Sequence, residues 1–76
     1  MDDNTDAEKL EKTIFEFIKN RTNQKESTAS RHIHRRFDIT MEKAQLVLTS
    51  FLEKKVIEEF YDIEHQENRY TLKSQN

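Results

Sequence analysis

The sequence predicts a single α+β domain in which three helices are followed by a β-hairpin. Apolar residues recur at three- and four-residue steps through the first two-thirds of the chain, which is the spacing of one helix face. The last third contains two β-prone runs, around Val56 and Tyr70, separated by a polar segment. With 76 residues and no cysteine, the chain has room for one core, formed without disulfides or thiolate metal sites.

The first helix is expected over residues 5–21, after an acidic lead-in over 1–4 that we expect to be disordered. Thr5 and Glu8 have the spacing of a capping box, in which each side chain accepts a backbone hydrogen bond at the helix start. Phe15 lies off the apolar face, so it either packs against the C-terminal end of the chain or belongs to a protein interface. The expected buried face comprises Leu10, Ile14, Phe17 and Ile18.

A second, shorter helix is expected over residues 29–36, with Ser27 or Thr28 as its cap. The third helix begins after the cap residue Thr40 and has the clearest periodicity in the chain. Its expected inner face comprises Ala44, Val47, Leu48, Phe51 and Leu52. Because the chain has no glycine, turns that need a positive φ are expected to use Asn or Asp. After the third helix, Lys55 or a neighbour is expected to adopt the turn geometry instead.

The hairpin is expected to consist of strands over residues 56–61 and 69–73, joined by a polar segment over 62–68. The folded domain therefore spans 5–73, and residues 74–76 form a tail. The second strand alternates, with Tyr70 and Leu72 on one face and Arg69, Thr71 and Lys73 on the other.

The formal net charge of −2 is unevenly distributed. Residues 1–18 carry six carboxylates against two lysines, residues 19–43 carry seven lysines and arginines against three carboxylates, and residues 44–76 carry six carboxylates against four cations. A basic middle segment is compatible with a polyanionic ligand even though the sequence pI is 5.9.

From about Leu10 to Leu72, the chain resembles the winged-helix (winged helix-turn-helix) superfamily. The resemblance rests on the inner face of the third helix, on the segment Glu53-Lys-Lys-Val-Ile-Glu-Glu59 that follows it, and on the return strand Arg69-Tyr-Thr-Leu72. It implies three helices plus a C-terminal β-hairpin wing, with the third helix entering the major groove of DNA and the second crossing the phosphate backbone. The chain is also similar to winged helices that bind proteins, such as the C-terminal domains of cullins and of the middle subunit of replication protein A.

The outward residues of the third helix are the candidates for reading DNA bases. Glutamine can bind adenine through two hydrogen bonds, hydroxyl groups can reach base edges, and leucine can contact a thymine methyl group. These candidates are Lys43, Gln45, Leu46, Thr49 and Ser50. The candidates for phosphate contacts are Lys25, Arg31, His34, Arg35 and Arg36. The favoured function is therefore that of a small protein that binds double-stranded DNA and regulates transcription, as a monomer or a homodimer.

Two features favour the alternative, a protein–protein interaction module (an adaptor or inhibitor) that does not bind nucleic acid. The hairpin segment is acidic, whereas a wing that contacts phosphate normally carries the opposite charge. Phe15 and Leu46 are large apolar side chains that could form an interface with another protein or with a second copy of the chain.

No enzymatic activity, metal, cofactor or small-molecule substrate is expected. The chain has no glycine for a phosphate-binding loop or a nucleophile elbow. His32 and His34 would lie about 200° apart around a helix and could not ligate one metal from there. No apolar run approaches the roughly 18 residues that cross a bilayer, and the acidic N-terminus lacks a secretory signal. We therefore expect no membrane partner and a cytoplasmic location, or a nuclear one in a eukaryote.

Overall fold

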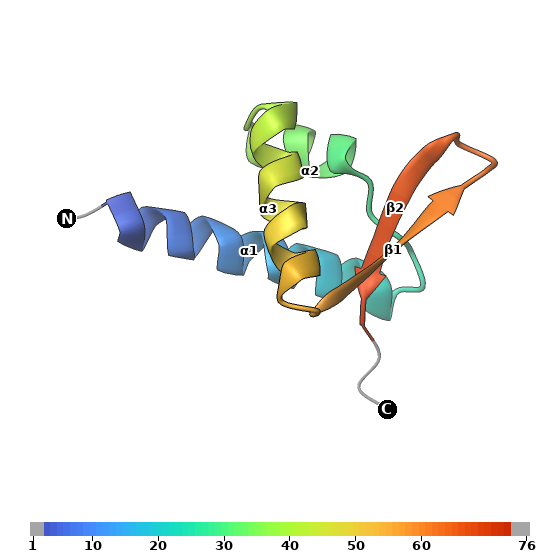
Figure 1. The fold of residues 1–76 in the computed structure, drawn as a ribbon, viewed down its shortest axis with the longest axis horizontal. Helices are drawn as coiled ribbons and strands as arrows, with labels where there is room; N and C mark the ends of the chain where they lie inside the picture. The colour runs from blue at the N-terminus through green and yellow to red at the C-terminus, as the bar shows by residue number, and fades with distance from the viewer. Residues whose placement is uncertain (1–2, 74–76) are drawn as a thin grey trace.

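The computed structural model describes residues 3–73, with side chains described from residue 8 onward. Three α-helices are followed by an antiparallel two-stranded hairpin, as expected for the α+β class (Figure 1). The elements are α1 (Asp3–Asn23), α2 (Ser30–Phe37), α3 (Met41–Glu53), β1 (Ile57–Asp62) and β2 (Glu67–Leu72). Met1, Asp2 and the expected tail over 74–76 lie outside the described residues.

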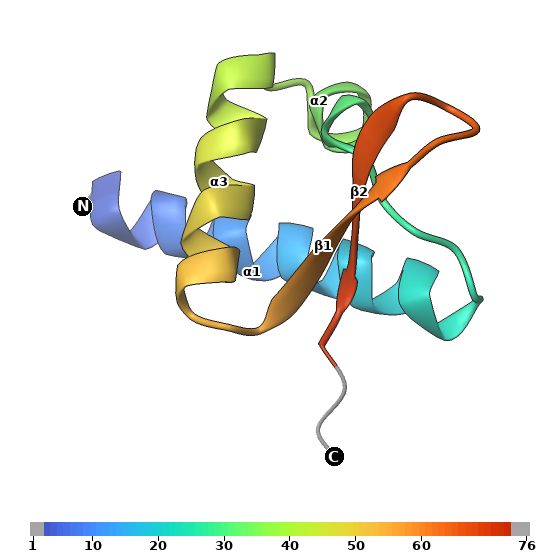
Figure 2. The same cartoon turned by 45° about the vertical axis from the view of Figure 1, so that its right-hand side comes forward.

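Helix α1 is the longest element and forms the base of the fold. It begins at Asp3, so Thr5 lies inside the helix and is not its N-cap, contrary to expectation. Carboxylates near a helix N-terminus interact favourably with the helix dipole, which is compatible with this earlier start. Helix α3 crosses α1 (Figure 2). The hairpin lies over the C-terminal half of α1, and the N-terminal part of α1 extends beyond α3.

The start of α2 differs from the expected capping. Ala29 occupies the N-cap position, and the Nδ1 atom of His32 accepts the backbone N–H of Ala29 at 2.9 Å. Thr28 is fully buried, and its hydroxyl oxygen accepts a hydrogen bond from Arg21 Nε at 3.1 Å. The expectation that Ser27 or Thr28 caps this helix is therefore wrong, because the side chain of Thr28 is engaged by α1.

Thr28 also joins the segment between α1 and α2 to the hairpin. Its backbone forms an isolated β-bridge with Tyr70, with N···O distances of 2.9 and 2.8 Å. The bridge lies on the side of β2 opposite β1, since β2 pairs with β1 along its other edge.

Helix α3 follows the expected pattern closely. The hydroxyl oxygen of Thr40 accepts the backbone N–H of Lys43 at 3.0 Å, which confirms the predicted N-cap. Lys55 has a φ of 61° after the last turn, as expected in the absence of glycine. Positive φ values also occur at Asp38, Lys25 and Gln66, so the expectation that such turns need Asn or Asp holds only for Asp38.

The two strands are offset by one or two residues from the predicted ranges. Their register pairs Ile57 with Leu72 and Glu59 with Tyr70. Tyr70 is buried in the core, and Arg69, on the opposite face of the strand, is also only 7% exposed. Alternation along one strand predicts the face of Arg69 but not the neighbours that cover it.

The core lies between the three helices and one face of the hairpin. The aromatic rings of Phe15 and Phe51 meet edge to face with their centroids 5.6 Å apart, which joins α1 to α3. The fully or nearly fully buried cluster comprises Ile14, Ile18, Ile33, Ala44, Val47, Leu48, Phe51, Ile57 and Tyr70. This set includes four of the five residues predicted for the inner face of α3, and the fifth, Leu52, packs against the cluster.

Among the helices of the described chain, none has both the length and the apolar character that a bilayer crossing requires.

Replacement of Phe51 by Ala tests this core. Phe51 is 4% exposed, and truncation of a buried phenylalanine removes apolar contacts and leaves a cavity, so we expect a loss of about 3–5 kcal/mol in the free energy of unfolding. The measurement is urea denaturation followed by circular dichroism. Leu46→Ala, at an exposed position of the same helix, is the control and should change stability far less. Equal losses in the two variants would contradict the observed packing of α3.

Candidate functional site

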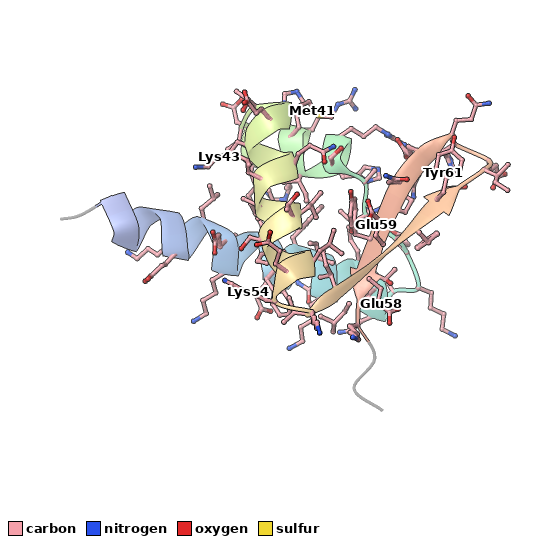
Figure 3. All side chains as sticks on the ribbon, in the orientation of Figure 1. Met41, Lys43, Lys54, Glu58, Glu59 and Tyr61 are labelled. Carbon is pink, nitrogen blue, oxygen red and sulfur yellow. The ribbon has the colours of Figure 1, made fainter. Side chains whose placement is uncertain are left out.

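The outward side of α3 is the first candidate surface. Lys43, Gln45, Leu46 and Thr49 are exposed there, as predicted, and Ser50 is half-buried. Met41 and Lys43 are both exposed in the N-terminal part of the helix and project from different sides of it (Figure 3). The Gln45 amide nitrogen donates a hydrogen bond to the hydroxyl oxygen of Ser30 at 3.1 Å, so this side chain connects α3 to the start of α2.

Leu46 also lies on α3, on the side near α1. It borders a small hollow of about 100 Å³ that is also lined by Leu10, Glu11, Lys43 and Val47. With 63% of its surface exposed, Leu46 presents apolar area at the edge of the α3 surface. Such a side chain can contact either a thymine methyl group or an apolar protein surface.

Three of the predicted phosphate contacts lie together at the end of α2. Arg35 and Arg36 are exposed, and neither forms an ion pair with a carboxylate within the described residues. The Arg36 guanidinium lies over the ring of Phe37, 5.6 Å from its centroid. His34 Nδ1 donates a hydrogen bond to the carbonyl of Ile39, which ties α2 to the turn that leads into α3. These basic residues form the last turn of α2, just before the turn that leads into α3.

Arg31 is held away from this group by the hairpin. Its Nε and Nη2 atoms donate to the two carboxylate oxygens of Glu67, at 2.9 and 3.0 Å. The hydrogen bonds from Arg31, followed by that from Arg69, lower the pKa of Glu67 to about 2. The hydrogen bond to Glu67 in turn raises the pKa of Arg31. Lys25, the fifth predicted phosphate contact, lies in the α1–α2 connection and lines the same hollow as Arg31. The structure thus divides the predicted phosphate contacts into two separate groups.

Arg69 is a buried charged residue that the sequence analysis did not identify. Its Nε donates to Glu67 at 2.7 Å, its Nη1 donates to the hydroxyl of Ser27 at 2.8 Å, and Asp62 lies 3.8 Å away. Buried charges are tolerated when paired and hydrogen-bonded, which is the situation here. The spacing of Glu67 and Arg69 on the same face of one strand was the sequence signal for this pair.

His32 is affected by the positive charge around it. Since Nδ1 accepts the backbone N–H of Ala29, the neutral ring carries its proton on Nε2. Burial of the ring, followed by the positive charges of Arg21, Arg31 and Arg69, lowers the pKa of His32. His32 therefore favours the neutral form that its capping contact requires.

The hairpin carries both acidic and apolar side chains. Glu58, Glu59 and Tyr61 are exposed on β1 (Figure 3). The Tyr70 hydroxyl donates to Glu59 at 3.0 Å, and burial of the phenol together with this carboxylate raises the pKa of Tyr70 to about 12. Ile63, at the tip, is 81% exposed, and Phe60 is also exposed.

Asp62, Glu64 and His65 bring three potential metal ligands within 4.8 Å of one another at the hairpin turn. Asp62 is already engaged, because it accepts hydrogen bonds from the backbone N–H of Glu64 and from the ring of His65. The hydrogen bond from His65 is the main cause that lowers the pKa of Asp62. Arg69 adds a positive charge 3.8 Å from the same carboxylate. We interpret this cluster as a stabilised turn and do not assign a metal site to it.

Phe15 lies partly buried against the core, in contact with Phe51. Of its two expected positions, the packed one is therefore observed, although its partner lies in α3 and not at the C-terminal end of the chain. Leu46 is the member of the predicted protein interface that remains exposed.

Comparisons of the chain with protein-family models, with curated proteins and with solved structures find no match. The information about function therefore comes from the arrangement of the chain's residues.

The cap formed by His32 predicts a pH-dependent stability. Because the folded-state pKa of His32 is below its usual value near 6.5, its contribution is full above about pH 6.5 and is lost as the pH falls toward the folded-state value. We expect the free energy of unfolding of the wild type to fall more between about pH 7.5 and 5.5 than that of His32→Gln, whose amide accepts a hydrogen bond but does not titrate in this range. Denaturant titrations at the two pH values measure the difference. An identical pH dependence in both proteins would contradict the role of His32.

Proposed function

We propose that this chain is a winged-helix protein that binds double-stranded DNA through α3 and acts as a transcription regulator. One observation carries the proposal. The outward side of α3 presents polar side chains to solvent, and the last turn of α2, which leads through a short turn into α3, carries Arg35 and Arg36, which have no carboxylate partner within residues 8–73. Base contacts and phosphate contacts from adjoining helices are the arrangement by which helix-turn-helix proteins bind DNA.

The dimensions of α3 support this docking. Its 13 residues correspond to about 20 Å of helix, and the major groove of B-DNA is about 12 Å wide, enough to admit one helix. Gln45 and Thr49 are one turn apart and exposed, so both can reach base edges from the same side. Gln45 would exchange its exposed hydrogen bond with Ser30 for a pair of hydrogen bonds with adenine.

In the proposed complex, the hairpin lies outside the interface with DNA. Glu58, Glu59 and Glu64 are exposed carboxylates that phosphate groups would repel. Arg31 is paired with Glu67 of the hairpin and belongs to a different part of the surface from Arg35 and Arg36. With few phosphate contacts, a monomer would bind with modest affinity, and a homodimer on a two-fold symmetric site would increase it.

Replacement of both Arg35 and Arg36 by Ala tests the phosphate contacts. If each contacts one phosphate, the double variant should bind all duplex sequences more weakly, and the slope of log K against log salt should fall by about two units. Fluorescence anisotropy with a labelled duplex at several salt concentrations measures both quantities. The control is Lys19→Ala with Lys73→Ala, which removes two exposed charges from α1 and from the end of β2.

Gln45→Ala separates base reading from phosphate binding in the same assay. It should reduce discrimination at one base-pair position, by about 1–3 kcal/mol, and leave the salt slope unchanged. A uniform loss of affinity over all sequences would show that Gln45 does not read a base. Unchanged binding in the double arginine variant would refute the proposed interface.

A second candidate function, a protein-binding module, is favoured by the exposed apolar side chains of the hairpin. Phe60, Tyr61 and Ile63 are all exposed on β1 and its turn, next to acidic residues. Phe60 and Tyr61 are neighbours on one strand and lie on opposite faces of the hairpin, so both faces offer an exposed apolar side chain with a polar surround to a partner. Leu46 on α3 is a further exposed apolar residue.

A second copy of the chain is the simplest partner to examine. If the hairpin forms a homodimer interface, sedimentation velocity should show a concentration-dependent dimer that Phe60→Ser with Ile63→Ser converts to monomer, because the exposed apolar area is lost. Leu46→Ala should leave the dimer intact. A monomer at all concentrations would exclude the hairpin as a homodimer interface.

A further inference from the structure

An open hollow of about 470 Å³ lies between the end of α1, the α1–α2 connection, the start of α2 and the hairpin. Its cationic lining residues are Arg21, Lys25, Arg31 and Arg69. His32 and His65 also line it, together with two carboxylates, Glu26 and Asp62. None of the candidate base-reading residues of α3 borders this hollow. It is therefore a separate concentration of positive charge in a chain whose formal net charge is −2.

The guanidinium groups around the hollow are held in place by hydrogen bonds. Glu67 accepts from both Arg31 and Arg69, at 2.9 and 2.7 Å, and so holds these two side chains next to each other. Arg21 donates from Nη2 to the carbonyl of Ser27 at 2.7 Å and from Nε to the hydroxyl of Thr28 at 3.1 Å. Side chains that are fixed before a ligand arrives lose less conformational entropy on binding it.

The contacts of Arg31 and Arg69 use only part of each guanidinium fork. The pair with Glu67 engages Nε and Nη2 of Arg31, which leaves Nη1 outside that pair. Arg69 uses Nε and Nη1 for Glu67 and Ser27, and Nη2 takes part in neither contact. A guanidinium has five N–H donors, so donors remain for an anion after these contacts are made.

His32 responds to the charges around the hollow. Burial of the ring lowers the pKa of His32, and the positive charges of Arg21, Arg31 and Arg69 lower it further, whereas Glu67 acts in the opposite direction. The ring also provides a donor, since its Nδ1 accepts a hydrogen bond and its Nε2 carries the proton.

We propose that this hollow binds the phosphate group of a ligand, either free phosphate or a phosphorylated small molecule, or a backbone phosphate of a nucleic acid. Forked guanidinium donors match the geometry of phosphate oxygens, and several fixed arginines around one opening are suited to a multiply charged oxyanion. The nearby carboxylates oppose an anion: Glu67 and Asp62 stay beside Arg69, whereas the contact of Glu26 with Arg21 is long, at 3.5 Å, and its side chain is 56% exposed, so Glu26 can turn toward solvent. The openness of the site and its carboxylates predict weak binding of inorganic phosphate, on the order of millimolar.

Inorganic phosphate is the probe for the first experiment. The ¹⁵N-labelled full chain is titrated with sodium phosphate at constant pH, with sodium chloride added to keep the ionic strength constant. Saturating chemical-shift changes are expected at the amides of Lys25, Ser27 and His32, and no such changes at Arg35 and Arg36. Changes that never saturate, or that occur equally at both groups of basic residues, would overturn the proposal.

Two matched lysine variants test whether the hollow itself is responsible. Lys25 and Lys55 both have left-handed backbone conformations, with φ of 65° and 61°, and both are exposed, but only Lys25 lines the hollow. Asparagine tolerates this conformation, so Lys25→Asn and Lys55→Asn each remove one charge without adding backbone strain. Lys25→Asn should weaken phosphate binding about three- to tenfold, the loss expected for one exposed charged contact, and Lys55→Asn should leave it unchanged. Equal effects of the two variants would overturn the proposal.

Glu26→Gln provides the opposite test, because removal of a negative charge from the lining should strengthen phosphate binding. A duplex with 5′-hydroxyl ends, which contains only phosphodiesters, distinguishes the sources of phosphate. Shifts at Lys25 and His32 with the duplex as well as with inorganic phosphate would assign nucleic acid as the source, and shifts with inorganic phosphate alone would assign a small ligand. A response to neither probe would overturn the proposal. Binding of the duplex at α3 is monitored separately by the amides of Gln45 and Thr49, so the outcome for the hollow does not depend on the function proposed for α3.

Discussion

The backbone bridge between Thr28 and Tyr70 is the contact on which the arrangement of the surfaces depends. It joins the connection before α2 to the second strand of the hairpin, 42 residues later in the chain. The Tyr70 ring is buried in the core on one face of that strand, while Thr28 is buried beneath Arg21 of α1. A single pair of backbone hydrogen bonds therefore fixes the start of α2, the end of α1 and the hairpin relative to one another.

This arrangement also determines how the basic residues are used. Because the bridge brings the start of α2 next to β2, Glu67 can accept hydrogen bonds from Arg31 and from Arg69. The basic middle segment of the sequence is thereby divided. Arg35 and Arg36 remain in the last turn of α2, whereas Arg31 joins a cluster on the hairpin side of the molecule. A charge count along the chain treats these residues as one group, and the tertiary structure separates them into two surfaces.

Because the basic residues are separated into two surfaces, a chain with a net negative charge can offer two local binding sites for anions. Carboxylates occupy the hairpin, where Glu58 and Glu59 are exposed, while arginines gather at the end of α2 and around the hollow. Electrostatic interactions weaken over about 8 Å at physiological salt, so a local excess of positive charge can act even though the whole chain is acidic. The nearby carboxylates also limit the affinity that either surface can reach.

The sequence by itself determined the number and order of the elements, the inner face of α3, its cap at Thr40 and the unusual turn at Lys55. Each of these features depends on hydrogen bonds or periodicity within a few residues, so the sequence predicts it without knowledge of the fold. Only the tertiary structure decided that Thr28 pairs with Tyr70 instead of capping α2, that Arg69 is buried, and that Glu67 binds Arg31 from 36 residues away. The reason is physical: such contacts depend on which segments the packed core brings together, and polar side chains with several potential partners carry no local signal that selects one of them.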